Sequence, residues 1–240
     1  MNPEELQAYR EMLARTAYDQ GVDFFGVADL TSVQGYVCRQ GGDYLKSFPR
    51  AISIGIRLLD PVIDELYRHE EPAVIFTYHS HYNTVNARLD QAALILAKKI
   101  QKDGYKTYPI PASQTINPEK LEGVISHKLV AHLSGLGWIG KSCLLITPEY
   151  GPRVRFATIM TDAPLKNGSP IPNRCGTCRK CVDICPVKAF TEVPFDPSDP
   201  REARFRAILC KEYMDIRKER VGEGLCGLCV YVCPFGARRC

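Results

Sequence analysis

Two cysteine-rich stretches decide how this sequence is interpreted. They read Cys175-Gly-Thr-Cys178-Arg-Lys-Cys181-Val-Asp-Ile-Cys185-Pro186 and Cys226-Gly-Leu-Cys229-Val-Tyr-Val-Cys233-Pro234, and Cys210 lies between them. Three thiolates in one tight loop can reach three irons of a cubane, whereas the cysteine before the proline begins the next element and points away. In two-cluster ferredoxins that fourth cysteine ligates the other cluster. The spacing therefore predicts two [4Fe-4S] clusters.

This crossed pattern assigns each cysteine to a cluster. We assign the first cluster to Cys175, Cys178, Cys181 and Cys233, and the second to Cys185, Cys210, Cys226 and Cys229. Zinc sites usually close with four ligands from two CxxC pairs, and a disulfide framework needs a secreted chain. Seven cysteines in two runs that end in Cys-Pro, together with Cys210 between them, fit neither alternative. We expect the three remaining thiols to be buried or incidental: Cys38, Cys143 and Cys240.

Composition predicts a cytoplasmic chain with a sizeable core and no membrane segment. The 240 residues are 45% hydrophobic, and apolar stretches such as residues 51–59 are too short to span a bilayer. Residues 1–10 are charged and do not look like a leader.

The positive charge is concentrated near the cysteines. The formal net charge is +4, and residues 166–240 hold 14 Lys and Arg against 9 Asp and Glu. An oxidised all-cysteine cubane carries about two negative charges, so two clusters nearly cancel this excess. The sequence shows no basic stripe and no helical-repeat extension after the cysteines. We therefore predict that tRNA is an unlikely partner.

Periodicity and turn residues outline helices and strands ahead of the cysteines. Helices are expected from residue 3 to about 20, over 83–102 and over 118–134. Strands are expected over 22–27, 51–58, 105–110, 142–147 and 154–161, with a further extended piece at 73–78. A Gly-rich connection covers 35–42. Residues 164–172, rich in Pro, Gly, Asn and Ser, form the boundary between domains at 1–165 and 166–240.

A glycine-rich loop lies before the expected strand at 142–147. It reads Gly135-Leu136-Gly137-Trp138-Ile139-Gly140-Lys141-Ser142. Glycines permit positive φ and let a flat ligand approach the backbone. The loop is neither a Walker loop nor a G-x-G-x-x-G motif, so a tight structural turn stays open as the alternative.

Four stretches together resemble epoxyqueuosine reductase. They are the loop, the following Leu144-Leu-Ile-Thr-Pro-Glu-Tyr-Gly151, the segment Thr161-Asp-Ala-Pro-Leu165 and the cysteine runs. That family shares a cobalamin-plus-two-cluster architecture with reductive dehalogenases. The resemblance covers most of the chain and is strongest from Gly135 onward. It implies an α/β (α+β) fold, with a nitroreductase-like core that binds cobalamin through Gly135 to Ser142. A bacterial two-[4Fe-4S] ferredoxin-like domain follows.

Three features depart from the family pattern. The family's proposed proton-donor aspartate falls at Leu121, beside Glu122 on the expected helix. Its Asp-Tyr-His before the long helix reads His81-Tyr82-Asn83, and the helical-repeat domain of tRNA-acting members does not follow Cys240. We expect a retained cofactor machinery and a changed substrate, namely a small molecule with a reducible carbon–oxygen or carbon–halogen bond.

The proton donor must then come from another residue near the loop. Tyr78 and Tyr82 rank above His127, because tyrosine stays protonated at neutral pH and burial favours neutral histidine. His69 lies in a charged run and is expected to be solvated.

Two functions follow from these residues. In the first, ferredoxin or flavodoxin supplies electrons that pass through the clusters to a corrinoid, which reduces the substrate. The alternative is an electron-transfer or activating protein that reduces a partner's redox centre. A flavin in place of the corrinoid is a third option.

Overall fold

The computed structural model describes residues 2–237, which leaves Cys240 outside the described part of the chain. The chain divides into two compact units. The first contains the residues up to Ile56 together with Val85–Gly137 and Arg155–Ile171; the second contains Arg57–Thr84, Trp138–Val154 and the residues from Pro172 onward. The units interleave along the sequence, so the boundary at residues 165 and 166 stays a prediction.

A four-stranded sheet forms the centre of the first unit. Its order is β1 (Phe24–Asp29), β2 (Arg50–Arg57), β6 (Val154–Thr161) and β3 (Thr107–Ile110). β1 pairs antiparallel with β2, and β3 pairs antiparallel with β6. The predicted fold class is confirmed as a mixed α/β core with a small antiparallel sheet.

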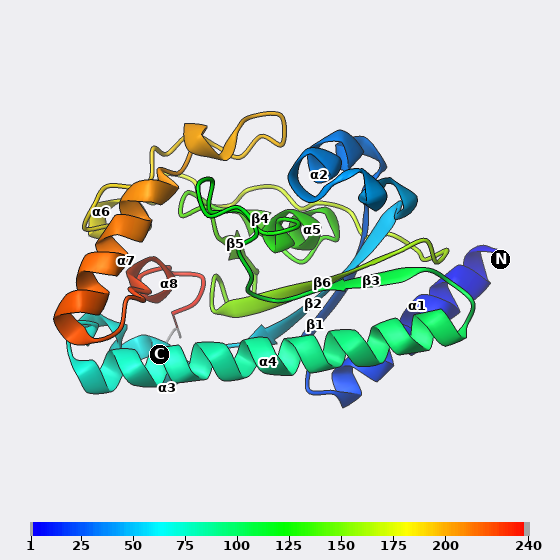
Figure 1. The fold of residues 1–240 in the computed structure, drawn as a ribbon, viewed down its shortest axis with the longest axis horizontal. Helices are drawn as coiled ribbons and strands as arrows, with labels where there is room; N and C mark the ends of the chain where they lie inside the picture. Colours follow the sequence, from blue (N-terminus) through cyan, green and yellow to red (C-terminus); the bar gives the residue numbers. More distant parts are fainter. Residues whose placement is uncertain (1, 238–240) are drawn as a thin grey trace. The chain divides into compact units, whose positions relative to one another are not determined.

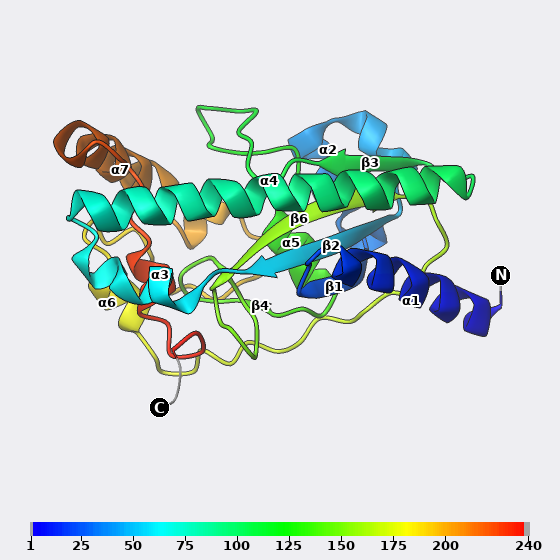
Figure 2. The same ribbon diagram turned by 90° about the horizontal axis from the view of Figure 1, so that it is seen from below.

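Helices cover both faces of this sheet (Figures 1 and 2). α1 (Pro3–Asp19) and the part of α4 (Pro72–Lys102) that belongs to this unit lie on one face; α2 (Gln34–Gly41) and α5 (His127–Leu133) lie on the other. Under α2 and α5, the core includes Ala28, Val37, Val130 and Met160. This burial removes apolar surface from water and fixes the helices on the sheet.

The start of α1 follows the chemistry expected from its sequence. The Asn2 side chain accepts a hydrogen bond from the Glu5 N–H at 2.9 Å, and the Glu5 carboxylate accepts one from the Asn2 N–H at 2.8 Å. Pro3 begins the helix without losing a useful donor. Gly21, at φ +76°, follows its end.

The predicted helix over 118–134 is wrong in its first half, because helix α5 begins only at His127. Residues 116–122 instead close a turn, in which the Glu122 carbonyl accepts from the Ile116 and Asn117 N–H groups at 2.9 and 3.0 Å. Leu121 has φ +54°, a left-handed conformation that no regular helix contains. The placement of Leu121 and Glu122 on one helix is therefore wrong too.

Other predicted elements also differ from the structure. Residues 73–78 are helical rather than extended, because α4 begins at Pro72 and its buried stripe runs from Ile75 through Tyr78. The expected Gly-rich connection contains helix α2. The expected strand over 142–147 is reduced to Leu145–Ile146.

The second unit contains short helices around the cysteine runs. They are α3 (Asp60–Asp64), η3 (Glu65–Arg68), the first part of α4, α6 (Lys180–Ile184), α7 (Ala207–Val221) and α8 (Leu228–Tyr231). α8 packs against α6, α3 and η3. β4 (Trp138–Ile139) and β5 (Leu145–Ile146) form a two-stranded antiparallel sheet. Within residues 2–237, no helix is long and apolar enough to cross a membrane.

Candidate functional site

Four of the cysteines line one cavity in the second unit. They are Cys175, Cys178, Cys181 and Cys233, and the wall also contains Lys141, Ser142, Ile146, Pro234 and Phe235. α6 carries Cys181, whereas Cys233 follows α8. Because α6 and α8 are in contact, their packing brings a cysteine of the second run to three of the first.

The other four cysteines gather at a second place in the same unit. Cys185 is buried in an apolar cluster with Val182 and Phe190, and Cys210 and Cys229 pack against that cluster. Cys226 lies close enough to interact electrostatically with Cys185, Cys210 and Cys229. Each group thus draws thiols from both cysteine runs.

The chemistry of these thiols fits [4Fe-4S] clusters. Burial and neighbouring thiols raise the pKa of Cys181 and of Cys210 to about 11. Iron binds the thiolate, and a bound cation reverses such an upward shift by stabilising the deprotonated sulfur. Within residues 2–237, no three His, Cys, Asp or Glu side chains are close enough to hold a single metal ion. A cubane instead spreads its four thiolates over four irons.

Trp138 joins the glycine-rich loop to the first cysteine group. Its indole Nε1–H donates to Cys175 Sγ at 3.4 Å, and its ring lies edge-on to Phe235 with centroids 4.8 Å apart. Only 1% of Trp138 is exposed. Hydrogen bonds to cluster sulfurs are among the interactions that set cluster potentials, so a cluster bound by Cys175 would feel this bond.

At two glycines of the loop, the place where a side chain would lie is filled by the protein's own chain. A β-carbon on Gly135 would lie 2.5 Å from the Ser169 carbonyl oxygen, and one on Gly140 would lie 2.8 Å from Ile146 Cγ1 and 3.2 Å from Cys175 Sγ. At these two glycines the space that a side chain would fill is occupied by the protein's own atoms, and their part in binding a corrinoid stays a prediction.

The remaining loop residues also have partners within their own unit. Leu136 packs near Gly26, and the Gly137 carbonyl lies 3.1 Å from His132 Nδ1. The Ile139 carbonyl accepts from Asn173 at 3.2 Å. Lys141 Nζ lies 3.7 Å from the Glu192 carboxylate, and Ser142 is buried. Lys141 and Ser142 nevertheless line the first cysteine cavity.

Tyr78 and Tyr82 lie in the second unit, one helical turn apart on α4. Their rings meet edge-on with centroids 6.4 Å apart. Tyr78 is 5% exposed, and its ring reaches 3.0 Å from where a β-carbon on Gly227 would lie. Gly227 follows Cys226, so Tyr78 packs on the loop of the second cysteine group. Tyr82 is only partly buried.

His127 lies in the first unit with both ring nitrogens engaged. Nδ1 is 2.7 Å from the Thr158 hydroxyl, and Nε2 is 2.9 Å from the Pro111 carbonyl. A carbonyl only accepts hydrogen bonds, so Nε2 carries the proton and Nδ1 accepts from Thr158. Burial lowers the pKa of His127 to about 4. The ring is neutral at pH 7, and its proton is held by the backbone.

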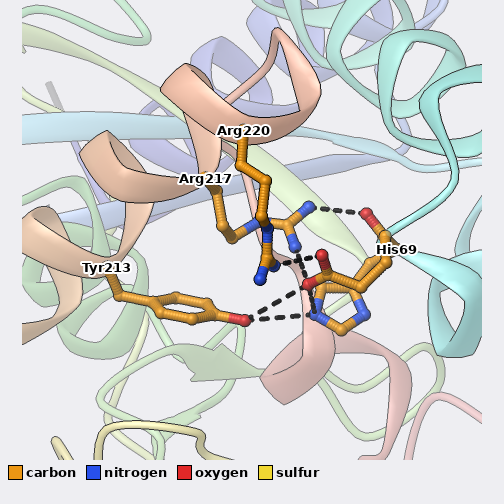
Figure 3. Close-up of polar contacts among 5 residues, drawn as sticks. His69, Tyr213, Arg217 and Arg220 are labelled. Atoms are coloured by element: carbon orange, nitrogen blue, oxygen red, sulfur yellow. Dashed lines mark hydrogen bonds and ion pairs between the residues drawn. The ribbon is translucent and has the colours of Figure 1, made fainter.

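A polar cluster that sequence reasoning missed, drawn in Figure 3, involves α7, the helix that carries Cys210, and lies near Cys226. His69, Tyr213, Arg217 and Arg220 converge there on the carboxylate of Glu70. The expectation that His69 is solvated is wrong, because its side chain is only 12% exposed. The available signal was the seven-residue spacing from Cys210 to Arg217, which places both on one face of a helix.

The cysteine segment is matched by a protein-family model. Residues 174–236 match the 4Fe-4S double cluster binding domain. This match confirms the iron–sulfur prediction at the level of the domain.

The remaining comparisons agree with the resemblance seen in the sequence. Epoxyqueuosine reductase of Bacillus anthracis is 32% identical over 148 residues, which span 59% of this chain and 37% of that relative. A solved reductive dehalogenase, whose structure was used to suggest a mechanism for B12-dependent dehalogenation, has a TM-score of 0.68 at 17% identity over 98% of this chain and 32% of its own. The predicted resemblance to both groups is confirmed, and the dehalogenase shares the fold.

The prediction that tRNA is an unlikely partner is contradicted. A solved epoxyqueuosine reductase with a tRNA stem loop has a TM-score of 0.58 at 20% identity, over 95% of this chain and 65% of its own. The prediction failed because it summed formal charge along a segment. Phosphates respond to where charges lie on a surface, not to such a sum.

Proposed function

We propose that this chain is an iron–sulfur oxidoreductase, in which two [4Fe-4S] clusters carry electrons to a bound corrinoid at which a substrate is reduced. The observation that supports this most directly is the grouping of eight cysteines into two sets of four, one of them around a single cavity. The fold shared with a B12-dependent reductive dehalogenase supports a corrinoid as the electron acceptor.

The substrate class that we propose contains a reducible carbon–oxygen bond. Curated relatives at about one-third identity are named for epoxyqueuosine, and a solved protein of this fold holds an epoxyqueuosine-modified tRNA stem loop. Converting an epoxide to an alkene consumes two electrons and two protons and releases the oxygen as water. The clusters deliver electrons but no protons, so the protein must supply the protons from a nearby acid.

We propose Tyr82 as that acid. His127 is neutral, with its only N–H proton bonded to the Pro111 carbonyl, and Tyr78 is packed on the Gly227 loop. Tyr82 is less buried, and its phenolic O–H can donate a proton. Replacing Tyr82 with Phe should lower turnover by roughly 100-fold or more, the lower range for losing a general acid. Cluster and corrinoid loading should not change. Normal turnover in Y82F would show that another group donates the proton.

The experiment for the whole proposal uses anaerobically purified chain with reconstituted clusters. Cobalamin is added, excess is removed by gel filtration, and the visible spectrum reports bound corrinoid. Turnover is then measured on a tRNA stem loop bearing epoxyqueuosine, with the deoxygenated nucleoside as product. Retained corrinoid with turnover supports the proposal. Retained corrinoid without turnover rejects this substrate. If no corrinoid is retained, a corrinoid is rejected as the electron acceptor.

A second function is favoured by the filled space at Gly135 and Gly140. Because the protein's own atoms occupy both positions, an electron-transfer protein that reduces a partner's redox centre fits the loop as well. Such a protein would contain both clusters, retain no corrinoid after gel filtration, and reduce a corrinoid protein supplied in trans.

A further inference from the structure

Helix α7 carries a cysteine of the second group and a buried arginine on one face. Cys210 and Arg217 are seven residues apart, which is two helical turns, and Tyr213 lies between them. Arg217 has no exposed surface. Burying a guanidinium fully costs free energy unless nearby groups compensate its charge. The neighbours of Arg217 therefore indicate the role of this arginine.

The neighbours of Arg217 come from the turn before α4. Arg217 Nη1 pairs with the Glu70 carboxylate, and Nη2 donates to the His69 carbonyl oxygen. Arg220 pairs with the same carboxylate from the exposed side of α7, as Figure 3 shows for the two arginines. Within residues 2–237, Arg217 Nε has no hydrogen-bond partner.

The charges of the polar cluster around Glu70 do not cancel. Two guanidinium groups share the single carboxylate of Glu70, and His69 is neutral because burial and Arg217 lower its pKa. The polar cluster therefore keeps one net positive charge, which lies beside the second cysteine group. Arg217 lies on the same face of α7 as Cys210 and close enough to Cys226 to interact electrostatically with its sulfur.

We propose that buried Arg217 raises the reduction potential of the cluster held by Cys185, Cys210, Cys226 and Cys229, and that Glu70 limits the effect. One electron converts the oxidised cluster to a form more negative by one charge, with no bond made or broken. A fixed positive charge stabilises the reduced form. This inference rests on the two-cluster part of the proposed function and is independent of the corrinoid and of the substrate.

The test is a potentiometric titration of the reconstituted protein, with dithionite as reductant and paramagnetic resonance as readout. At an effective dielectric constant of about 20, a unit charge roughly 10 Å away changes a one-electron equilibrium by on the order of tenfold. We expect R217Q to disfavour the reduced second cluster about tenfold, a shift of about 59 mV to more negative potential. E70Q should shift the same wave in the opposite direction.

Two controls separate charge from packing. R220Q removes an arginine bonded to the same carboxylate but 58% exposed, so solvent screening should leave it with a smaller shift than R217Q. R217K retains the charge and should stay closer to the wild type. W138F removes the hydrogen bond to Cys175 and should change only the potential of the first cluster. This result assigns each of the two reduction steps to its cluster.

Opposite shifts in R217Q and E70Q establish the proposal. The proposal is contradicted if R217Q and E70Q shift the potential in the same direction, or if R217Q and R220Q shift it equally. It is also contradicted if R217Q shows no shift while about eight irons are retained. If R217Q does not retain its cluster, E70Q decides alone, and the absence of a positive shift rejects the role of the charge. Wild type with fewer than eight irons would contradict the proposed function instead.

Discussion

His127 shows how burial sets the protonation of one side chain and links it to pH. Burial beside Thr158 and Pro111 lowers its folded-state pKa to about 4, whereas an unfolded histidine titrates near 6.5. Between these values the unfolded chain binds more protons, so the free energy of unfolding falls as pH decreases. We expect His127 to reduce stability by ~1–2 kcal/mol between pH 7 and pH 5.

The matched variant is H127Q, whose amide can still donate to the Pro111 carbonyl but does not titrate in this range. Urea unfolding at pH 7 and pH 5 under anaerobic conditions measures both proteins. The wild type should lose more stability than H127Q by that amount. An equal loss in the two proteins would show that His127 is protonated when folded, or that its pKa is not lowered.

The turn between β4 and β5 depends on a residue without a side chain. The Gly140 N–H donates to the Leu144 carbonyl, and the Gly140 carbonyl accepts from the Cys143 N–H, both at 2.9 Å. An alanine β-carbon at this position would meet Ile146 at 2.8 Å and Cys175 Sγ at 3.2 Å. We predict that G140A displaces Cys175 and lowers occupancy of the first cluster, so that iron falls from about eight toward about four per chain.

The control for this turn is G35A in helix α2. The nearest heavy atom to a β-carbon on Gly35 is 3.9 Å away, and alanine is the better helix former by about 1 kcal/mol. G35A should keep its iron and its stability. Eight irons and unchanged spectra in G140A would mean that the turn relaxes without moving the cysteine.

Elements that the sequence predicted well are those with an uninterrupted apolar pattern. The strand over 154–161 has the predicted bounds, and the long helix was identified from its stripe through Leu89 and Leu96, although it begins earlier at Pro72. The segment 118–126 failed because Asn117 and Pro118 look like a helix start. In the structure, Asn117 Oδ1 accepts from the Lys120 N–H inside a closed turn, an arrangement with the same local sequence signature.

At the scale of the whole molecule, we propose that the two cysteine runs exchange a ligand. Cys185 belongs to the first run, yet it is buried with Cys210 and Cys229 near the second group. We predict that C185A destroys the second cluster and leaves the first, whose cavity is lined by Cys175, Cys178, Cys181 and Cys233. Iron and sulfide analysis should give about four of each per chain.

Paramagnetic resonance identifies which cluster survives in C185A. The remaining signal should respond to W138F and not to R217Q, because Trp138 bonds Cys175 whereas Arg217 lies on the helix of Cys210. A surviving signal that responds to R217Q would contradict the crossed arrangement and place Cys185 with its own run.

The candidate site divides into a part that spacing predicts and a part that only folding reveals. The cysteines were predictable because a cubane imposes distances that a short loop must meet. The pairing of Glu70 with Arg217 joins residues 147 positions apart, and no local pattern specifies such a contact. The role of the glycines at 135 and 140 in cofactor binding stays a prediction, because a sequence does not show whether a ligand or the chain itself fills the space beside a glycine.

The exchange of ligands between the runs also bears on how the protein is made. While the ribosome has translated only the first run, the cavity of Cys175, Cys178 and Cys181 still lacks Cys233, and Cys185 lacks Cys229. Neither site is complete until both runs have been synthesised and α8 has packed on α6. Iron insertion must therefore follow translation of both runs, and a premature stop codon before Cys226 would deprive both sites of ligands at once.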